Sequence, residues 1–200
     1  MCSIATTSAW DGARLVVFPE CFLSVYPSGA WAAAAATWAD GCDELWERMW
    51  ASSVEGVGRV GGLICWENRM PLARWAVYQG GPQIWLAPNA DDSEGWIVSM
   101  RHIAIEAGAF VVSVPQYIPA SAFPIDFPLP LPAGVEVFGR GGACIVAPSG
   151  DVIAGPLYDA EGIVVADCDL RDALHAKRYF DVVGHYGRQD VLSHRLPEAD

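Results

Sequence analysis

Short apolar runs alternate along this chain with stretches of helical periodicity, and this pattern predicts strands that alternate with helices. The first such run, residues 13–18, is rich in β-formers and ends at Pro19-Glu20, which is typical of a buried strand. Four such runs occupy residues 13–18, 61–65, 83–88 and 109–114.

Two stretches between these runs predict helices. Residues 71–79 open with a proline and are followed by Gly80-Gly81, as at the two ends of a helix. Residues 96–107 repeat apolar side chains at helical spacing. The face that they mark consists of Trp96, Met100, Ile103 and Ala107. A third helix is predicted over residues 29–50, which are rich in Ala and Trp.

The second half of the chain predicts a loop, a hairpin, a strand and a helix. Residues 115–132 contain too many prolines for a regular helix or strand, so this segment is predicted to be a loop. The later elements are a hairpin over residues 143–147 and 152–154, a strand over 162–169 and a helix over 170–180. No internal repeat is present, and the order of elements predicts a layered α/β domain.

Composition indicates one globular domain over residues 1–200. Hydrophobic residues make up 52% of the chain and charged residues 18%, which is enough apolar material for a sizeable core. The formal net charge is −12. An acidic surface repels phosphate groups, so nucleic acid and anionic membranes are poor partners.

The six cysteines are scattered, without a CxxC pair or the spacing of a zinc site. We therefore expect reduced thiols in a cytoplasmic protein that uses no metal and no cofactor. The first residues have neither a basic segment nor an apolar core, so no secretory signal is predicted. No apolar run reaches the length of a membrane span.

Cys65 is the strongest candidate for a reactive group. A thiol where a buried strand turns into a helix can face backbone N–H groups, and the helix dipole favours its thiolate. Glu20 also follows a predicted strand, and if the two strands are neighbours, its carboxylate can take the thiol proton and later activate water. The alternatives are a packed structural cysteine and a solvated loop carboxylate.

Several segments resemble motifs of the nitrilase branch of the carbon–nitrogen hydrolase superfamily. Residues 15–20, Leu-Val-Val-Phe-Pro-Glu, look like the segment that bears the general base, and residues 62–68, Gly-Leu-Ile-Cys-Trp-Glu-Asn, look like the nucleophile segment. Further matches follow in the family's order, so that the resemblance spans roughly residues 13 to 192. They comprise residues 70–74, 100–106, 155–157, 161–162, 177–181 and 184–186.

The resemblance implies an α-β-β-α sandwich that forms a homo-oligomer and hydrolyses a small-molecule nitrile to a carboxylic acid and ammonia. By this resemblance Cys65 is the nucleophile that forms the thioimidate and thioester, and Glu20 is the general base. The backbone N–H of Trp66 stabilises developing negative charge, and Glu67 supports the turn through hydrogen bonds. The family lines its substrate pocket at the positions of Asn89 and Ala90.

One part of the family's pattern is missing. The superfamily uses a catalytic lysine between the glutamate and the cysteine, yet the only lysine of this chain is Lys177, which matches a later motif. Only 45 positions separate Glu20 from Cys65. The sandwich is therefore expected to be incomplete, without its first strand and a central segment. We predict impaired nitrilase activity. An amidase-like hydrolase and a non-catalytic subunit stay as alternatives.

Overall fold

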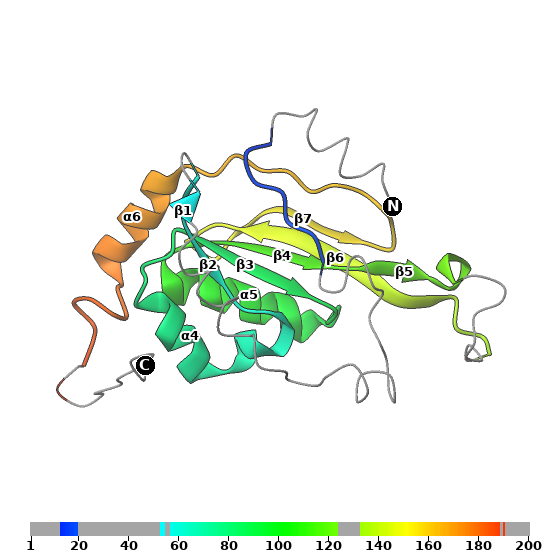
Figure 1. The fold of residues 1–200 in the computed structure, drawn as a ribbon, viewed down its shortest axis with the longest axis horizontal. Helices are drawn as coiled ribbons and strands as arrows, with labels where there is room; N and C mark the ends of the chain where they lie inside the picture. The colour runs from blue at the N-terminus through cyan, green and yellow to red at the C-terminus, as the bar shows by residue number, and fades with distance from the viewer. Residues whose placement is uncertain (1–12, 20–52, 55–56, 124–132, 189, 191–200) are drawn as a thin grey trace.

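The computed structural model describes residues 13–19, 53–54, 57–123, 133–188 and 190, and it forms a mixed sheet with helices (Figure 1). The predicted helix over residues 29–50 lies outside the described residues, and so does Glu20. The strand order is β1-β2-β3-β4-β6-β5, and β7 pairs with β6. The seven strands are β1 (Ser53–Val54), β2 (Gly58–Gly62), β3 (Ile84–Asn89), β4 (Phe110–Pro115), β5 (Tyr117–Pro119), β6 (Val137–Val146) and β7 (Val152–Tyr158).

The centre of the sheet is parallel and its edges are antiparallel. Strands β2, β3 and β4 run in the same direction, with Gly62 opposite Leu86 and Leu86 opposite Val112. The other pairs, β1 with β2, β4 with β6, β5 with β6 and β6 with β7, are antiparallel. Because parallel strands end at the same edge, the turns after β2 and β3 emerge together.

Helices α4 (Pro71–Tyr78) and α5 (Glu94–Ala107) cover one face of the sheet (Figure 1). The predicted face of α5 is confirmed, since Trp96, Met100, Ile103 and Ala107 are all buried. They pack against sheet residues that include Trp85, Ala87, Val111 and Val146. On the opposite face Leu86, Pro88, Val112 and Val114 are only half-buried. The described residues thus supply one helix layer and one sheet layer.

Both predicted helix boundaries at α4 and the predicted hairpin are confirmed. Pro71 occupies the first turn of α4, and the chain leaves the helix through Gly80 and Gly81, whose φ is +62°. The hairpin is longer than expected, because β6 begins at Val137 and β7 continues to Tyr158. Helix α6 (Leu170–Tyr179) starts at Asp169, whose carboxylate accepts the Arg171 N–H.

Two predicted strands are wrong. Residues 13–19 contain no strand, and Val16 is 40% exposed. A strand exists only where a neighbouring strand completes its backbone hydrogen bonds. Strand β2 pairs with β1 at Gly58 and Arg59 and with β3 from Val60 to Gly62. Residues 162–169 also contain no strand, although their side chains alternate between exposed and half-buried. In these two runs the apolar content therefore predicted neither full burial nor strand pairing correctly.

The prediction of an entirely irregular segment over residues 115–132 is also wrong in part. Strand β5 and a short 3₁₀ helix, η2 (Ala120–Ala122), occupy its beginning, while residues 124–132 lie outside the described part. Pro119 fits at the end of β5 because β5 is an edge strand of the sheet. None of the helices within the described ranges is long and apolar enough to cross a bilayer.

Candidate active site

Cys65 stands on a tight turn just after β2. The predicted strand over residues 61–65 ends earlier, at Gly62, and Cys65 begins the 3₁₀ helix η1 (Cys65–Arg69). Gly62 allows β2 and β3 to approach closely, since a Cβ atom there would lie 2.1 Å from the Leu86 carbonyl oxygen. The chain then turns so sharply that Cys65 has a φ of +47°.

The backbone of Cys65 is strained. A left-handed conformation costs a residue with a side chain about 1–2 kcal/mol, and such strain persists only where surrounding contacts impose it. The two other cysteines of the described residues lack this geometry. Burial raises the pKa of the Cys144 thiol to about 11. Burial, together with the Asp167 charge, also raises the pKa of the Cys168 thiol, so neither is a ready thiolate.

Asn68 imposes the turn from its buried side. Its side chain is completely buried, and its amide nitrogen donates to the carbonyl oxygens of Leu63 at 2.7 Å and Cys65 at 2.9 Å. Its amide oxygen accepts the indole N–H of Trp85 at 2.7 Å. The bonds to Leu63 and Trp85 are buried and the bond to Cys65 is partly buried, so together they restrain the backbone on both sides of the thiol. Asn68 was not among the residues predicted for the site, although it lies in the Cys-Trp-Glu-Asn motif.

Glu67 and Trp66 complete the turn. A Glu67 carboxylate oxygen accepts the backbone N–H of Ile64 at 2.8 Å, which is the kind of contact that a supporting role requires. Trp66 is the second residue of η1, and the N–H groups in the first turn of a helix have no acceptor within that helix. The turn therefore presents a backbone N–H next to the thiol.

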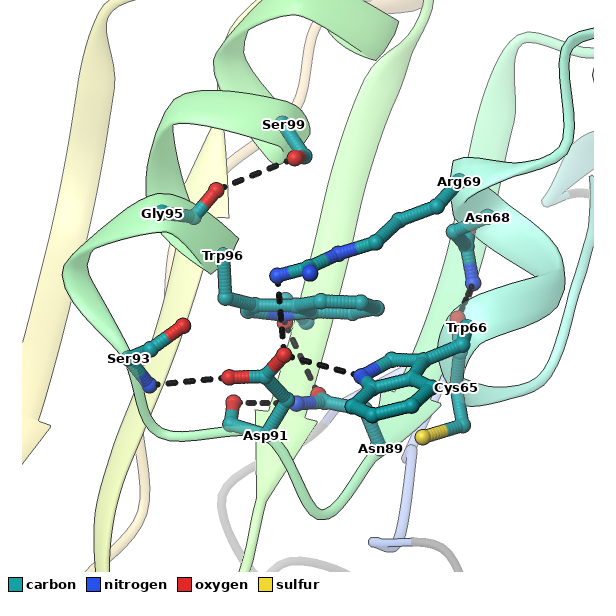
Figure 2. Close-up of polar contacts among 11 residues, drawn as sticks. Cys65, Trp66, Asn68, Arg69, Asn89, Asp91, Ser93, Gly95, Trp96 and Ser99 are labelled. Atoms are coloured by element: carbon teal, nitrogen blue, oxygen red, sulfur yellow. Dashed lines mark hydrogen bonds and ion pairs between the residues drawn. The ribbon is translucent and has the colours of Figure 1, made fainter.

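Asp91, in the loop after β3, ties this turn to the neighbouring strand (Figure 2). One carboxylate oxygen accepts the Trp66 indole N–H at 2.9 Å and the Arg69 guanidinium at 2.8 Å. The other accepts the Ser93 backbone N–H at 3.0 Å. The Arg69 guanidinium carbon lies 5.7 Å from the ring centroid of Trp66 and 5.8 Å from that of Trp96, within cation–π range.

The contacts of Asp91 keep its carboxyl group ionised. Burial opposes ionisation, but the hydrogen bonds from Ser93 and Trp66 and the charge of Arg69 outweigh it and lower the pKa of Asp91 below its ordinary value. Asp91 was not among the residues predicted for the site. The only signal was the place of Asp91, two residues after the end of a strand parallel to β2.

The expected pocket residue Asn89 does not face solvent. It is completely buried, its amide nitrogen donates to the Asp91 carbonyl oxygen at 2.6 Å, and its amide oxygen accepts the Ser113 hydroxyl at 3.2 Å. Ser113 in turn accepts the Trp96 indole N–H at 2.8 Å. Asn89 therefore anchors the loop that carries Asp91. Ala90, the next residue of that loop, is half-buried.

A second ionic cluster braces η1 against the helices. Arg74 of α4 donates to the Asn68 carbonyl oxygen at 3.0 Å and to Glu106 of α5 at 2.9 Å, and the Tyr78 hydroxyl donates to Glu106 at 2.6 Å. Burial opposes ionisation of Glu106, but these hydrogen bonds outweigh it and lower its pKa. Burial and the hydrogen bond to Glu106 raise the pKa of Tyr78, so it stays a neutral donor.

Lys177 lies far from the thiol. It belongs to α6, and its ammonium group donates to the carbonyl oxygen of Pro82, just before β3 begins. Cys65 follows the end of β2, which runs parallel to β3, so the six residues of β3 separate the two groups. At about 3.3 Å per residue this length is about 20 Å. Lys177 thus lies near the start of the central parallel strands, and Cys65 lies beyond their carboxyl ends.

No metal site is evident in the described segments, where no three His, Cys, Asp or Glu side chains gather closely enough to hold an ion. The site consists of the backbone turn at η1 and the thiol that this turn carries. It belongs to an α/β protein that presents a strained cysteine where parallel strands end.

Comparisons with known proteins identify the family. Residues 43–178 match the carbon–nitrogen hydrolase model, a range that includes Cys65, Asp91 and Lys177 but not Glu20. Nitrilase 1 of Arabidopsis thaliana is 48% identical over 143 residues, which cover 68% of this chain and 41% of that protein. The bifunctional nitrilase/nitrile hydratase NIT4A of Lupinus angustifolius is 46% identical over 144 residues, with the same shares of 68% and 41%.

A solved structure shares the fold. The C. elegans NitFhit protein superposes with a TM-score of 0.54 at 24% identity, over 68% of this chain and 30% of that chain. This chain belongs to the carbon–nitrogen hydrolase family, and the resemblance to nitrilases is confirmed. It spans about two fifths of the length of the curated relatives that it matches.

Proposed function

We propose that this chain carries the thiol centre of a nitrilase-type hydrolase, with Cys65 as the nucleophile. In this reaction the sulfur adds to the nitrile carbon and gives a thioimidate, water replaces ammonia to leave a thioester, and a second water releases the carboxylic acid. The observation that carries the proposal is the strained, hydrogen-bonded turn that presents Cys65. The nitrilase relatives support a nitrile as the substrate.

The remaining roles follow from the same centre. Glu20 is the general base that takes the thiol proton. Since Glu20 lies outside the described residues, the support for this role is the sequence Phe18-Pro19-Glu20 alone. The Trp66 backbone N–H stabilises the developing negative charge, supported by its position at the start of η1. Glu67 keeps the turn in place through its bond to Ile64.

We further propose that turnover by this chain is impaired. The only lysine, Lys177, lies at the opposite edge of the sheet, and the nearby Arg69 is engaged by Asp91. An arginine is moreover a poor proton donor. Loss of one donor to developing negative charge typically costs about 10²–10³ in rate.

Ammonia release from aliphatic and aryl nitriles tests both parts. The purified chain is expected to release little ammonia, and Cys65→Ala is expected to release none. Robust release that Cys65→Ala abolishes would support the nucleophile and refute the impairment. Release that survives Cys65→Ala would refute the nucleophile.

Two alternatives make different predictions. An amidase-like hydrolase prefers amides, so parallel assays with a nitrile and its matching amide separate it from a nitrilase. A non-catalytic subunit is favoured by the missing lysine, and its Cys65 should react with iodoacetamide no faster than a simple thiol. Association into a homo-oligomer stays a prediction that size-exclusion chromatography with light scattering tests.

A further inference from the structure

The Asp91 carboxylate joins three parts of the chain at one point. Its oxygens receive hydrogen bonds from the Trp66 indole, the Arg69 guanidinium and the Ser93 backbone N–H. Trp66 and Arg69 belong to η1, whereas Ser93 precedes the first turn of α5. The carboxylate is itself well shielded, with its side chain only 12% exposed. The loop after β3 and the turn after β2 are therefore linked through one side chain.

Trp66 needs this link because burial does not hold it. The residue is 63% exposed, so the hydrophobic effect fixes little of its large ring. The hydrogen bond to Asp91 and the guanidinium of Arg69 near the ring face are its recorded directional contacts. Figure 2 shows the Trp66 indole nitrogen directed toward the Asp91 carboxylate, with the Arg69 guanidinium and the Trp96 ring above it in this view.

The turn is thus held from two sides. Asn68 restrains it from the core through the carbonyl oxygens of Leu63 and Cys65. Asp91 restrains it from the solvent side through the side chains of Trp66 and Arg69. The Trp66 N–H lies in the same peptide plane as the Cys65 carbonyl that Asn68 holds, and Asp91 holds the Trp66 side chain at the other end of this N–Cα unit, so each restraint contributes to the direction of the Trp66 N–H.

We propose that Asp91 is a positioning residue of this centre, which fixes the Trp66 indole and thereby aims the Trp66 backbone N–H at the oxygen or nitrogen that becomes negative during attack by Cys65. The inference rests on the proposed function, because it assigns the aim of a donor in that reaction. Asp91 does not transfer a proton itself, since its two oxygens already accept three donors, one of them the cation Arg69.

An aldehyde probe measures this role without requiring turnover. When Cys65 adds to butyraldehyde, a sulfur–carbon bond forms, the carbon–oxygen double bond becomes single, and the thiol hydrogen moves to the oxygen. The resulting thiohemiacetal places that oxygen where the backbone donor acts. Its formation can be titrated by NMR with butyraldehyde labelled with ¹³C at the carbonyl carbon. The rate of alkylation of Cys65 by iodoacetamide, followed by mass spectrometry, measures thiol access separately.

The variants are Asp91→Ala, Trp66→Phe and the double variant. Trp66→Phe removes only the indole donor and keeps the backbone N–H. We expect each single variant to weaken aldehyde binding about tenfold while the alkylation rate changes less than twofold. The double variant should lose no more than the larger single loss, because both changes break the same link. The control is Asp169→Ala, which removes a carboxylate that caps α6 and pairs with Arg171 at the other edge of the sheet.

The outcomes separate the two levels of the proposal. The positioning role is overturned if the unaltered chain, Asp91→Ala and Asp169→Ala bind the aldehyde equally well. The proposed nucleophile is unaffected by that result. Additive losses in the double variant also overturn it, because Asp91 would then act independently of the Trp66 indole. If the unaltered chain binds no more aldehyde than Cys65→Ala does, Cys65 does not react with the probe. The proposed function then fails, and the positioning role fails with it.

Discussion

Replacement of Asn68 by alanine removes the buried support of the turn that presents Cys65. The Asn68 side chain makes three hydrogen bonds, two to carbonyl oxygens and one from the Trp85 indole. In Asn68→Ala the Trp85 N–H, whose residue is completely buried, loses its acceptor. The backbone carbonyls of Leu63 and Cys65 lose their donor at the same time.

The expected loss in the free energy of unfolding is about 3 kcal/mol. An unsatisfied buried donor or acceptor costs about 1–3 kcal/mol, and the two carbonyls keep some of their interactions with nearby groups, so the full sum is not reached. Urea denaturation followed by tryptophan fluorescence measures the change. Ser149→Ala is the control, since Ser149 hydrogen-bonds Asp151 at an exposed turn and its loss should stay within about 0.5 kcal/mol.

A second measurement links stability to the thiol. At a urea concentration where both proteins are folded, Cys65 of Asn68→Ala should be alkylated by iodoacetamide at an altered rate, because the strained backbone can relax. A stability loss below about 1 kcal/mol together with an unchanged alkylation rate would refute the claim that Asn68 imposes the turn.

Three further results are expected. The free energy of unfolding of Cys65→Gly should be about 1 kcal/mol higher than that of Cys65→Ala, because glycine tolerates the φ of +47°. Equal free energies of unfolding in urea would contradict the claim of backbone strain. The pKa of Glu106 is lowered in the folded chain, so its contribution is present above about pH 4.5 and is lost as the pH falls through the folded pKa; Glu106→Gln should flatten this acid limb of a pH–stability curve, and an unchanged limb would contradict the cluster with Arg74 and Tyr78. Lys177→Met should leave the alkylation rate of Cys65 within twofold, and a larger change would contradict its remote place.

The helices were predictable because their signals are local. The proline in the first turn of α4 and the glycines after its last turn mark where the helix begins and ends, and each signal acts within one helical turn. The buried face of α5 repeats at helical spacing, so one side of it is apolar before any contact is known. Strands β3 and β4 were predictable for a similar reason, since each is a short apolar run, the first preceded by Gln83 and the second bounded by Gly108 and Pro115.

The failures come from pairing, which local patterns do not contain. Residues 13–18 and 162–169 have the apolar content of strands, yet a strand exists only where a neighbour completes its hydrogen bonds. Strand β5 shows the reverse case, because a proline-rich segment became an edge strand once β6 lay beside it.

The same division applies to the site. Cys65 and Glu67 were predictable from a contiguous motif. Asp91 was not, because its link to Trp66 spans 25 positions and depends on β2 and β3 lying side by side in parallel. Asn89 was predicted to follow the strand but is the last residue of β3, and burial against Ser113 turned its side chain away from solvent. Sequence position therefore located the loop without giving the direction of its side chains.

Mass spectrometry of the chain after incubation with a nitrile tests the central claim most directly. Addition of one nitrile to a thiol increases the mass of the peptide by the mass of the whole nitrile, and slow hydrolysis lets this thioimidate accumulate. The adduct is expected on the peptide that contains Cys65 and on none that contains any of the other five cysteines. An adduct spread equally over the cysteine peptides, or one that persists in Cys65→Ala, would contradict the assignment of Cys65 as the nucleophile.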